Sequence, residues 1–336
     1  MMKLPAGKVP SNILAEIVYR NLGAKRSEVV VGPSPGLDGA VIAVGKKALV
    51  TSMDPITGAL SRIGWLAVNI NANDVATFGV QPAFFSSCLL LPENATEKTV
   101  KTICKQIDKG AKELDIAVVG GHSETTPNLQ FPIVVGCCMG ISEKGAYVTA
   151  REAKPGNMLI LTKAAGIEGT AILASDRHVQ LAGRMEETEL KRAEGFFKYI
   201  SVVKEAFLAF QTGHVTAMHD PTEGGVAGGI HEMADASNVG FKVYRDRIPI
   251  AKETLRICRF LEIDPLQLIA SGSLLIAVER GYASEVLRIL ERNRIAARVI
   301  GELTSSPSER LLIREGNIIE DLARPLSDEL WQALKK

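Results

Sequence analysis

The sequence predicts an α/β protein, in the broad sense that includes α+β folds, with two domains. Its 336 residues are 46% hydrophobic, enough to bury a sizeable core and long for a single domain. Short apolar runs alternate along the chain with segments whose apolar residues recur at helical spacing. A polar segment with Pro155 and Gly156, TAREAKPGN, is typical of a linker. We therefore expect one domain at residues 1–150 and a second at residues 151–336.

The elements of the first domain follow from these patterns in chain order. Apolar residues at helical spacing predict a helix in PSNILAEIVYRNLG that ends at Gly23. Apolar runs predict strands in EVVVG, AVIAV and ALVTSMD, and a turn at Gly45 joins the last two. A helix near residues 63–78, the strand FFSSCLLLP, a helix near residues 96–114 and the strands IAVVGG and PIVVGCCMGI complete the domain. The second domain opens with a strand in MLILTKAAG and closes with a helix in PLSDELWQALKK.

Charge and hydropathy limit the classes of partner. Lys and Arg number 39 against 38 Asp and Glu, without a block of like charge that would bind nucleic acid or anionic lipid. The apolar runs are well short of the roughly twenty residues that span a bilayer, and MMKLPAGKVP has no apolar signal core. We therefore predict a cytoplasmic protein that acts on a small molecule, without a nucleic-acid or membrane partner.

The stretch HDPTEGGVAGG, residues 219–229, places four glycines at an expected helix start. Asp220 as N-cap, Pro221 as the first helical residue and Glu223 three residues after the cap would form a capping box. This local explanation does not cover the glycines, because each glycine inside a helix costs about 0.8–1 kcal/mol relative to alanine. N–H groups at a helix start bind anions, and glycine lets a phosphate or a neighbouring strand come close. We favour a ligand site over tight helix packing alone.

Three aspartates on separate segments suit a shared cation. NINANDVATFGVQP holds three asparagines and Asp74 within six residues, although such side chains are poor helix formers; the alternative is that an asparagine caps a broken helix. Asp38 precedes a strand in PGLDGAVI and Asp54 ends a strand in TSMDP, and each alone is an ordinary turn residue. Together, strand-end and helix-start carboxylates suit Mg²⁺, which prefers oxygen ligands and shares its shell with substrate phosphates.

A further candidate segment, VVGGHSETTP, combines two glycines with several polar side chains. A buried strand is expected to end in Gly120 and Gly121, before His122, Ser123 and Glu124. A lone histidine such as His122 is more often structural than catalytic. Conventional phosphate loops do not fit: GAVIAVGKKA has five residues between its glycines where a Walker loop needs four, and no G-x-G-x-x-G opens a helix in the first domain. A nucleotide would therefore be held in another way.

Five motifs in this order resemble the ATP-using superfamily of aminoimidazole ribonucleotide (AIR) synthetase: GLDGAVI, TSMDP, NANDVATFGVQP, GGHSE and MHDPTEGGVAGG. The superfamily includes thiamine-monophosphate kinase, selenophosphate synthetase and the hydrogenase maturation factor HypE, and the match covers nearly the whole chain. The phrase HDPTEGGVAGGIHEMADASNVG is most similar to HypE-type sequences. The resemblance implies an N-terminal mixed-sheet domain that pairs in a homodimer and a C-terminal α/β sandwich domain.

The resemblance also implies ATP and Mg²⁺ as cofactors and gives each motif a role. Asp38, Asp54 and Asp74 match aspartates at the metal and phosphates, GGHSE a glycine loop at the nucleotide, and HDPTEGG a loop that begins a helix over the cleft. The implied chemistry is transfer of the ATP γ-phosphate to an acceptor, which depends on positioning and charge neutralisation. The residues assigned to catalysis are Asp74, Glu124, His219 and Asp220. Those assigned to the nucleotide are Lys8, Asp38, Gly120, Gly121, His122, Ser123, Thr222, Glu223, Gly224 and Gly225.

Three departures from HypE-type sequences leave the acceptor open. The chain ends WQALKK in place of a Pro-Arg-x-Cys tail, Glu124 stands at the position of a lysine, and Ser271 in ASGS stands at that of a glutamate. We favour an ATP-dependent enzyme that activates a carbamoyl-like group or a small molecule, with a maturation protein as a further partner. The alternatives are a small-molecule kinase similar to thiamine-monophosphate kinase and a non-catalytic maturation or scaffold protein that keeps the nucleotide.

Overall fold

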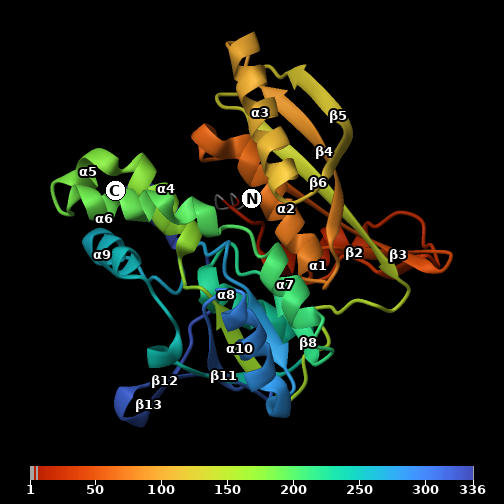
Figure 1. Cartoon of the computed structure of the whole chain (residues 1–336), viewed down its shortest axis with the longest axis vertical. Helices are drawn as coiled ribbons and strands as arrows, with labels where there is room; N and C mark the ends of the chain where they lie inside the picture. The colour runs from red at the N-terminus through yellow and green to blue at the C-terminus, as the bar shows by residue number, and fades with distance from the viewer. Residues whose placement is uncertain (1–3, 5–6, 336) are drawn as a thin grey trace. The chain divides into compact units, whose positions relative to one another are not determined.

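The computed structural model describes residues 4 and 7–335, which form two units (Figure 1). The N-terminal unit comprises Arg26–Gly32 and Asp38–Tyr147. The C-terminal unit comprises Pro33–Leu37 and the described parts of Met1–Lys25 and Val148–Lys336. The first residues therefore group with the C-terminal unit, whereas the sequence-based boundary assigned them to the first domain. Within the described ranges, no helix is both long enough and apolar enough to cross a membrane.

The N-terminal unit is built on a six-stranded mixed sheet. Across the sheet, the strands are β1 (Val29–Val31), β2 (Ala40–Val44), β3 (Lys47–Ile56), β6 (Ile133–Glu143), β4 (Pro82–Leu91) and β5 (Ala117–Thr125). All neighbours pair antiparallel except β4 and β5, which are parallel because the connection between them contains a helix. Each of these strands had been predicted from its apolar run, and the turn at Gly45 between β2 and β3 is confirmed by its left-handed φ of 61°.

Two helices pack in this unit, α2 (Ile63–Ala76) and α3 (Glu97–Glu113), and both were predicted. Every residue of α2 except Trp65 is buried, including its three asparagines, so the helix is unbroken and lies between the sheet and α3. Helix α3 buries one stripe, Ile103, Ile107, Gly110 and Ala111, and Thr96 caps its start by accepting from the backbone N–H of Thr99. Together these helices cover one face of the sheet.

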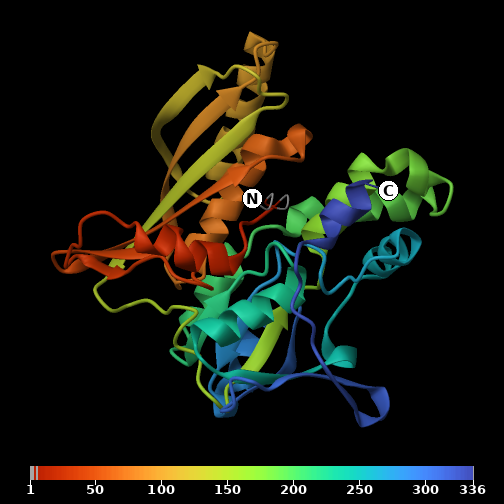
Figure 2. The same cartoon turned by 180° about the vertical axis from the view of Figure 1, so that it is seen from behind.

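The other face of this sheet, seen in Figure 2, is apolar and only half-buried. Along β6, Gly136 and Gly140 face α2, where a Cβ atom would lie 2.4 Å from Asn71 and 2.9 Å from Val75. The alternate residues Val135 and Cys137 point the opposite way and are partly exposed. A polar surface would be expected on a face that solvent alone covers.

The C-terminal unit contains a seven-stranded sheet. Its order is β13 (Ile318–Asp321), β12 (Arg310–Arg314), β9 (Gly240–Tyr244), β11 (Ala297–Thr304), β7 (Met158–Thr162), β10 (Leu275–Val278) and β8 (Val215–His219). Pairing is antiparallel except between β12 and β9. Strand β10 is buried throughout, and one core cluster joins the sheet residues Leu159, Phe241 and Leu275 to Val226 and Ile230 of the helix α8 (Gly225–Ala236).

The remaining helices of this unit are α1 (Ser11–Glu16), α4 (Ile167–Asp176), α5 (His178–Ala182), α6 (Glu187–Glu194), α7 (Val203–Phe210), α9 (Lys252–Leu261), α10 (Ala283–Arg292) and α11 (Glu329–Lys335). Helix α4 contacts α6, α9 and α11, which makes a helical group beside the sheet. Helix α1 is shorter than the predicted 10–23 and is followed by a 3-10 turn, because Ile17, Val18 and Leu22 are exposed and no packing extends it.

Candidate functional site

The predicted metal ligands of the N-terminal unit lie on elements that hydrogen bonds tie together. The backbone N–H of Asp54 on β3 donates to Asn71 Oδ1 at 2.8 Å, and Asn71 Nδ2 donates back to the Asp54 carbonyl at 3.2 Å. Ser52 Oγ donates to Asp74 Oδ2 at 2.6 Å. These bonds give two of the polar side chains of α2 a role: Asn71 fixes the helix against β3, and Asp74 is oriented by Ser52.

The positions of the three aspartates differ in part from the prediction. Asp54 lies within β3, two residues before its end, and Asp74 lies in the last turn of α2 instead of at a helix start. Asp38 precedes β2, next to Gly39, whose absent Cβ lets the chain approach the Thr51 carbonyl of β3. Among the described residues of this unit, no three acid, histidine or cysteine side chains lie close enough together to share one ion. A joint Mg²⁺ site of the three aspartates stays a prediction.

The GGHSE segment is not the end of a buried strand, as predicted, but the middle of β5, an edge strand whose nine residues are all exposed. Gly121 has a packing reason, since a Cβ there would lie 2.0 Å from the Ser87 carbonyl of β4, whereas a Cβ on Gly120 would meet nothing within 4 Å. On the exposed edge, His122 Nε2 lies 3.2 Å from Glu124 Oε2. The burial prediction failed because edge strands pair on one side only, which a sequence run does not reveal.

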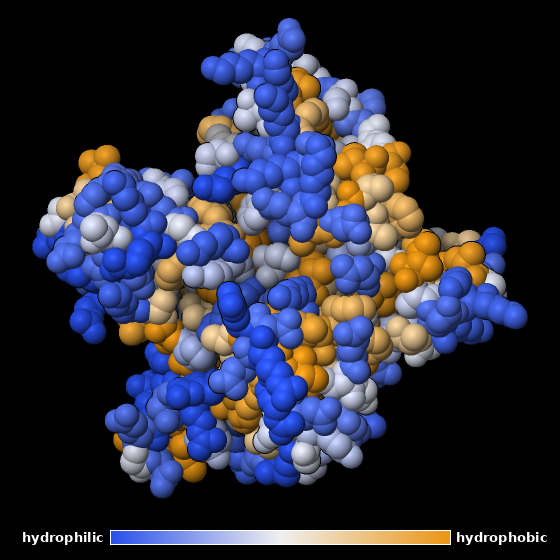
Figure 3. Space-filling model, viewed as in Figure 1, coloured by the Kyte–Doolittle hydropathy of each residue, from blue (hydrophilic) through white to orange (hydrophobic). Residues whose placement is uncertain are grey.

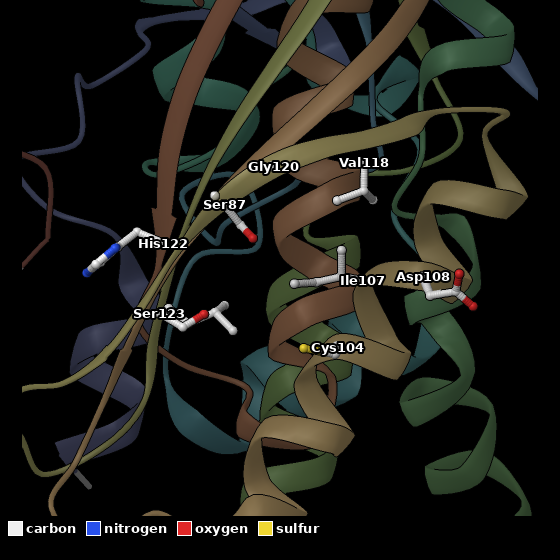
Figure 4. Close-up of a pocket in the computed structure, with 10 residues that line it drawn as sticks. Ser87, Cys104, Ile107, Asp108, Val118, Gly120, His122 and Ser123 are labelled. Carbon is white, nitrogen blue, oxygen red and sulfur yellow. The ribbon is translucent and has the colours of Figure 1, made fainter.

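A pocket of about 370 Å³ opens between β5 and α3 in the N-terminal unit (Figure 4). Strand β5 contributes Gly120, His122 and Ser123, and α3 contributes Cys104 and Asp108. All four residues of this segment that were predicted to contact the nucleotide, Gly120, Gly121, His122 and Ser123, therefore line one hollow. The pocket is open to solvent, as expected where only one side of a strand is covered.

The HDPTEGG segment of the C-terminal unit does not form the predicted capping box. Helix α8 begins at Gly225 with Gly224 as N-cap, and Asp220 and Glu223 lie before it. Gly224 and Gly225 have left-handed φ values of 82° and 61°, which a helix continuing from Pro221 could not accommodate. The capping pattern was outweighed by these two glycines, which turn the chain before the helix begins.

Close packing accounts for most of the α8 glycines. A Cβ on Gly225 would lie 2.5 Å from the Leu268 carbonyl, and one on Gly229 would lie 2.7 Å from Pro221 Cβ. The N–H groups of Gly224, Gly225 and Ala227 already have acceptors, namely Asp328 Oδ2, the Thr222 carbonyl and the Leu266 carbonyl. The helix start is therefore not an open row of donors for a phosphate, and packing explains more of this motif than the sequence indicated.

A second pocket, of about 290 Å³, lies beside Gly224 and Gly228. Its charged wall residues are Lys8, Glu223, Glu232, Arg324 and Asp328. Lys8 contacts two of the carboxylates of this pocket. Its backbone N–H donates to Glu223 Oε2 at 2.7 Å, and its Nζ lies 3.1 Å from Glu232 Oε1. Both signs of charge thus meet in one hollow of the C-terminal unit.

His219, at the end of β8, is paired with Glu232 of α8. His219 Nε2 lies 3.0 Å from Glu232 Oε2, and the His219 side chain is buried. Burial alone would raise the pKa of Glu232, but the His219 hydrogen bond and the Lys8 charge lower it to about 2. Glu232 is therefore an anion at neutral pH. Asp220, the next residue, is also buried, whereas Thr222 is partly exposed.

Two further carboxyl groups were missed by the sequence analysis. Glu168 lies in the first turn of α4 and is 6% exposed; burial, with the charges of Asp328 and Glu223, raises its pKa to about 7, although Ser271 lowers it. Neither Glu168 Oε2 nor Ser271 Oγ has a partner in hydrogen-bonding geometry among the described residues. The sequence did hold an indication of Glu168. In GIEGT, Gly166 and Gly169 lie close to this acidic residue, as glycines also follow the glutamate of HDPTEGG.

Asp328 connects the start of α11 to the glycines at the start of α8. Its Oδ2 accepts from the Gly224 N–H at 2.7 Å and its Oδ1 from the Leu330 N–H at 2.8 Å, so it caps α11. Burial raises the pKa of Asp328 to about 7 despite these bonds. Only the tertiary structure brings the terminal helix beside the α8 glycines.

The fold and these motifs define a two-domain AIR synthase related protein. Profiles of the AIR synthase related protein match residues 36–142 for the N-terminal domain and residues 154–314 for the C-terminal domain. Because together they cover most of the chain, the chain belongs to this family.

Within the family, the similar proteins include hydrogenase maturation factors. A chain of Methanocaldococcus jannaschii named for hydrogenase expression/formation is 30% identical over 306 residues, 89% of this chain and 88% of that protein. Carbamoyl dehydratase HypE of Escherichia coli is 26% identical over 77% of this chain and 75% of its own.

Solved structures show the same fold. HypE in a HypE–HypF complex superposes with a TM-score of 0.78 at 22% identity, over 93% of this chain and 99% of that one. HypE in complex with ATP has a TM-score of 0.72 at 19% identity, over 98% of each chain. The two-sheet α/β architecture predicted from the sequence is therefore confirmed.

Proposed function

We propose that this chain is a HypE-related, ATP- and Mg²⁺-dependent enzyme that transfers the ATP γ-phosphate to a carbamoyl, amide-like or other small acceptor. The observation that carries the proposal is the pair Asp54 and Asp74: Asn71 ties the Asp54 backbone of β3 to α2, and Ser52 orients the Asp74 carboxylate. Two carboxylates on elements joined by hydrogen bonds, in a family whose relatives include a HypE solved with ATP, support a Mg-nucleotide site.

The residues fit such a site chemically. Asp54 and Asp38 are partly exposed, and all three aspartates carry the hard carboxylate oxygens that Mg²⁺ prefers as ligands. When bound, Mg²⁺ would neutralise charge on the phosphates. The residues of the chain would orient the metal and, through His122 and Ser123 of the open β5 pocket, the nucleotide.

The pocket beside α8 suits the acceptor. Lys8 and Arg324 can bind an oxyanion, while Glu223 and Glu232 can accept N–H groups, so an amide or carbamoyl group would find both kinds of partner. Glu168 and Asp328, with pKa values of about 7, are suited to take up a proton near neutral pH. In this proposal Glu223 and Lys8 bind the acceptor, whereas the sequence-based prediction assigned them to the nucleotide.

A homodimer through the N-terminal unit is part of the proposal. Met53, Val118, Val119 and Ile141 are 64%, 50%, 56% and 51% exposed, and Figure 3 shows hydrophobic residues gathered over the strands of this unit. A surface of this kind indicates a protein partner. A second copy would cover the exposed β5 edge and its pocket; a maturation protein is a further partner, by analogy with the HypE–HypF complex.

Calorimetry of Mg-ATP binding tests the proposal. We expect wild type to bind ATP only with Mg²⁺, and Asp54→Asn and Asp74→Asn to lose about tenfold or more in affinity, equivalent to about 1.4 kcal/mol. Asp246→Asn, an exposed carboxylate in the C-terminal unit, is the matched control and should bind like wild type. Equal binding by all four proteins, or none by wild type, would contradict the proposal and favour the scaffold function.

Product analysis separates the two enzymatic functions. A dehydrating, HypE-like enzyme releases phosphate once per turnover, whereas a small-molecule kinase forms a phosphorylated product without releasing phosphate. The kinase is kept as the second candidate because thiamine-monophosphate kinase bound to AMPPCP and TMP shares the fold, with a TM-score of 0.72 at 16% identity.

A further inference from the structure

Lys163, directly after β7, has its ammonium group enclosed by oxygen atoms from three other segments. Its Nζ donates to the backbone carbonyls of Tyr199 at 2.9 Å, Ser201 at 2.6 Å and Gly272 at 2.8 Å. Glu205 Oε1 of α7 lies 2.5 Å from the same nitrogen. The Lys163 side chain is 17% exposed and that of Glu205 only 3%, so water contributes little to this shell.

The number of donors matches the charged form of Lys163, although burial lowers the pKa of this ammonium group and only the nearby Glu205 opposes that shift. An ammonium group carries three N–H donors and no acceptor, whereas a neutral amine carries two donors. Four oxygen atoms face the nitrogen, and one of them belongs to a buried carboxylate that would otherwise be unpaired at considerable cost. Backbone carbonyls with a carboxylate are also the oxygen set by which proteins bind monovalent and other hard cations.

The carbonyls converge because two loops pack directly on each other. Gly272 has a φ of 104°, and a Cβ there would lie 2.6 Å from the Tyr199 carbonyl oxygen. Ser273 Oγ adds a bond to the Ala164 carbonyl at 2.6 Å. Carbonyl dipoles that point at one place repel each other unless a positive charge lies between them, so the 271–273 loop needs a cation here.

This loop is connected to the helix starts of the candidate acceptor region. The Ile269 carbonyl accepts from the Gly169 N–H of α4 at 3.0 Å, and the Leu266 carbonyl accepts from the Ala227 N–H of α8 at 2.9 Å. Ser271 lies next to Glu168 and lowers its pKa. A shift of the 271–273 loop would therefore move Ser271 relative to Glu168.

We propose that Lys163 is a tethered cation: its ammonium group fills a monovalent-cation site of three backbone carbonyls and the Glu205 carboxylate, and so positions the 271–273 loop. Removal of the side chain beyond Cβ leaves a site for a free cation of the ammonium or K⁺ class. The wild-type protein, which carries its own cation, needs none. This inference is independent of the nucleotide and of the proposed function.

Rescue of Lys163→Ala by small cations tests the inference. The variant lacks Cγ, Cδ, Cε and Nζ, which n-propylammonium reproduces atom for atom. We expect a lower urea midpoint for the variant and a saturable recovery of most of that loss with n-propylammonium or K⁺, but not with tetramethylammonium at equal ionic strength. Lys163→Met, which keeps the stem and blocks the site, is the matched control and should show no recovery. Wild type should respond equally to K⁺ and Na⁺.

Several outcomes would overturn the inference: no recovery in Lys163→Ala, equal recovery in Lys163→Met, or equal recovery with tetramethylammonium. If Lys163→Ala does not fold, wild type itself provides the measurement. Its ¹⁵N–¹H spectrum of lysine ammonium groups should contain one signal with slow proton exchange, and Glu205→Gln should shift or broaden it. Absence of a protected signal, or its indifference to Glu205→Gln, would show that no enclosed ammonium exists.

Discussion

Replacing Glu168 by glutamine should stabilise the protein at neutral and alkaline pH. The buried Glu168 carboxyl keeps its proton until about pH 7, whereas its ordinary pKa is 4.5. Between these values the folded state binds more protons than the unfolded state, so the free energy of unfolding falls as pH rises from 4.5 to about 7. Glutamine keeps the shape and cannot ionise, so the variant lacks this fall.

The two pKa values set the size of the effect. Their difference corresponds to about 3 kcal/mol of stability lost by wild type above pH 7, relative to acid conditions below 4.5. Between about pH 5 and about pH 8, we therefore expect the variant to gain about 2–3 kcal/mol relative to wild type. The new amide hydrogens add a constant term, which does not change the slope with pH.

Urea unfolding followed by tryptophan fluorescence measures this gain. The chain has two tryptophans, and a Trp65→Phe background leaves Trp331 of α11, which packs on α4, as the reporter for the C-terminal unit. Glu97→Gln, in the exposed first turn of α3, is the matched control and should show no such slope. A difference between Glu168→Gln and wild type that stays constant with pH, or falls as pH rises, would refute the reasoning.

Two further results are expected from the C-terminal unit. Gly225→Ala should destabilise it by about 2 kcal/mol more than Gly213→Ala in urea unfolding, because both positions have left-handed φ but only Gly225 faces carbonyls, at 2.5 and 2.6 Å; equal losses would contradict the packing explanation. For Glu232, whose pKa is lowered from 4.5 to about 2, wild type should lose stability as pH falls from 4.5 towards 2, and Glu232→Gln should flatten this acid loss by about 3 kcal/mol. An unchanged acid profile would show that the His219 and Lys8 contacts do not hold this carboxylate.

The sequence by itself determined the strands and the two main helices of the N-terminal unit and their order. Strands such as β3 and β6 are long apolar runs, and α3 carries one apolar stripe behind a threonine cap, so local physics is sufficient to place them. The ordered motifs around Asp38, Asp54 and Asp74 also identified the family, because several short patterns in one order are far more specific than any of them alone.

What only the tertiary structure decided depends on contacts between distant segments. The exposure of GGHSE follows from the place of β5 at the sheet edge, and the need for Gly225 follows from carbonyls some forty residues away. The enclosure of Lys163 by oxygens from two loops and α7, and the near-neutral pKa of Glu168, leave no periodic trace in the sequence. Burial and long-range hydrogen bonds set these properties, since desolvation depends on everything that surrounds a group and not on its neighbours in the chain.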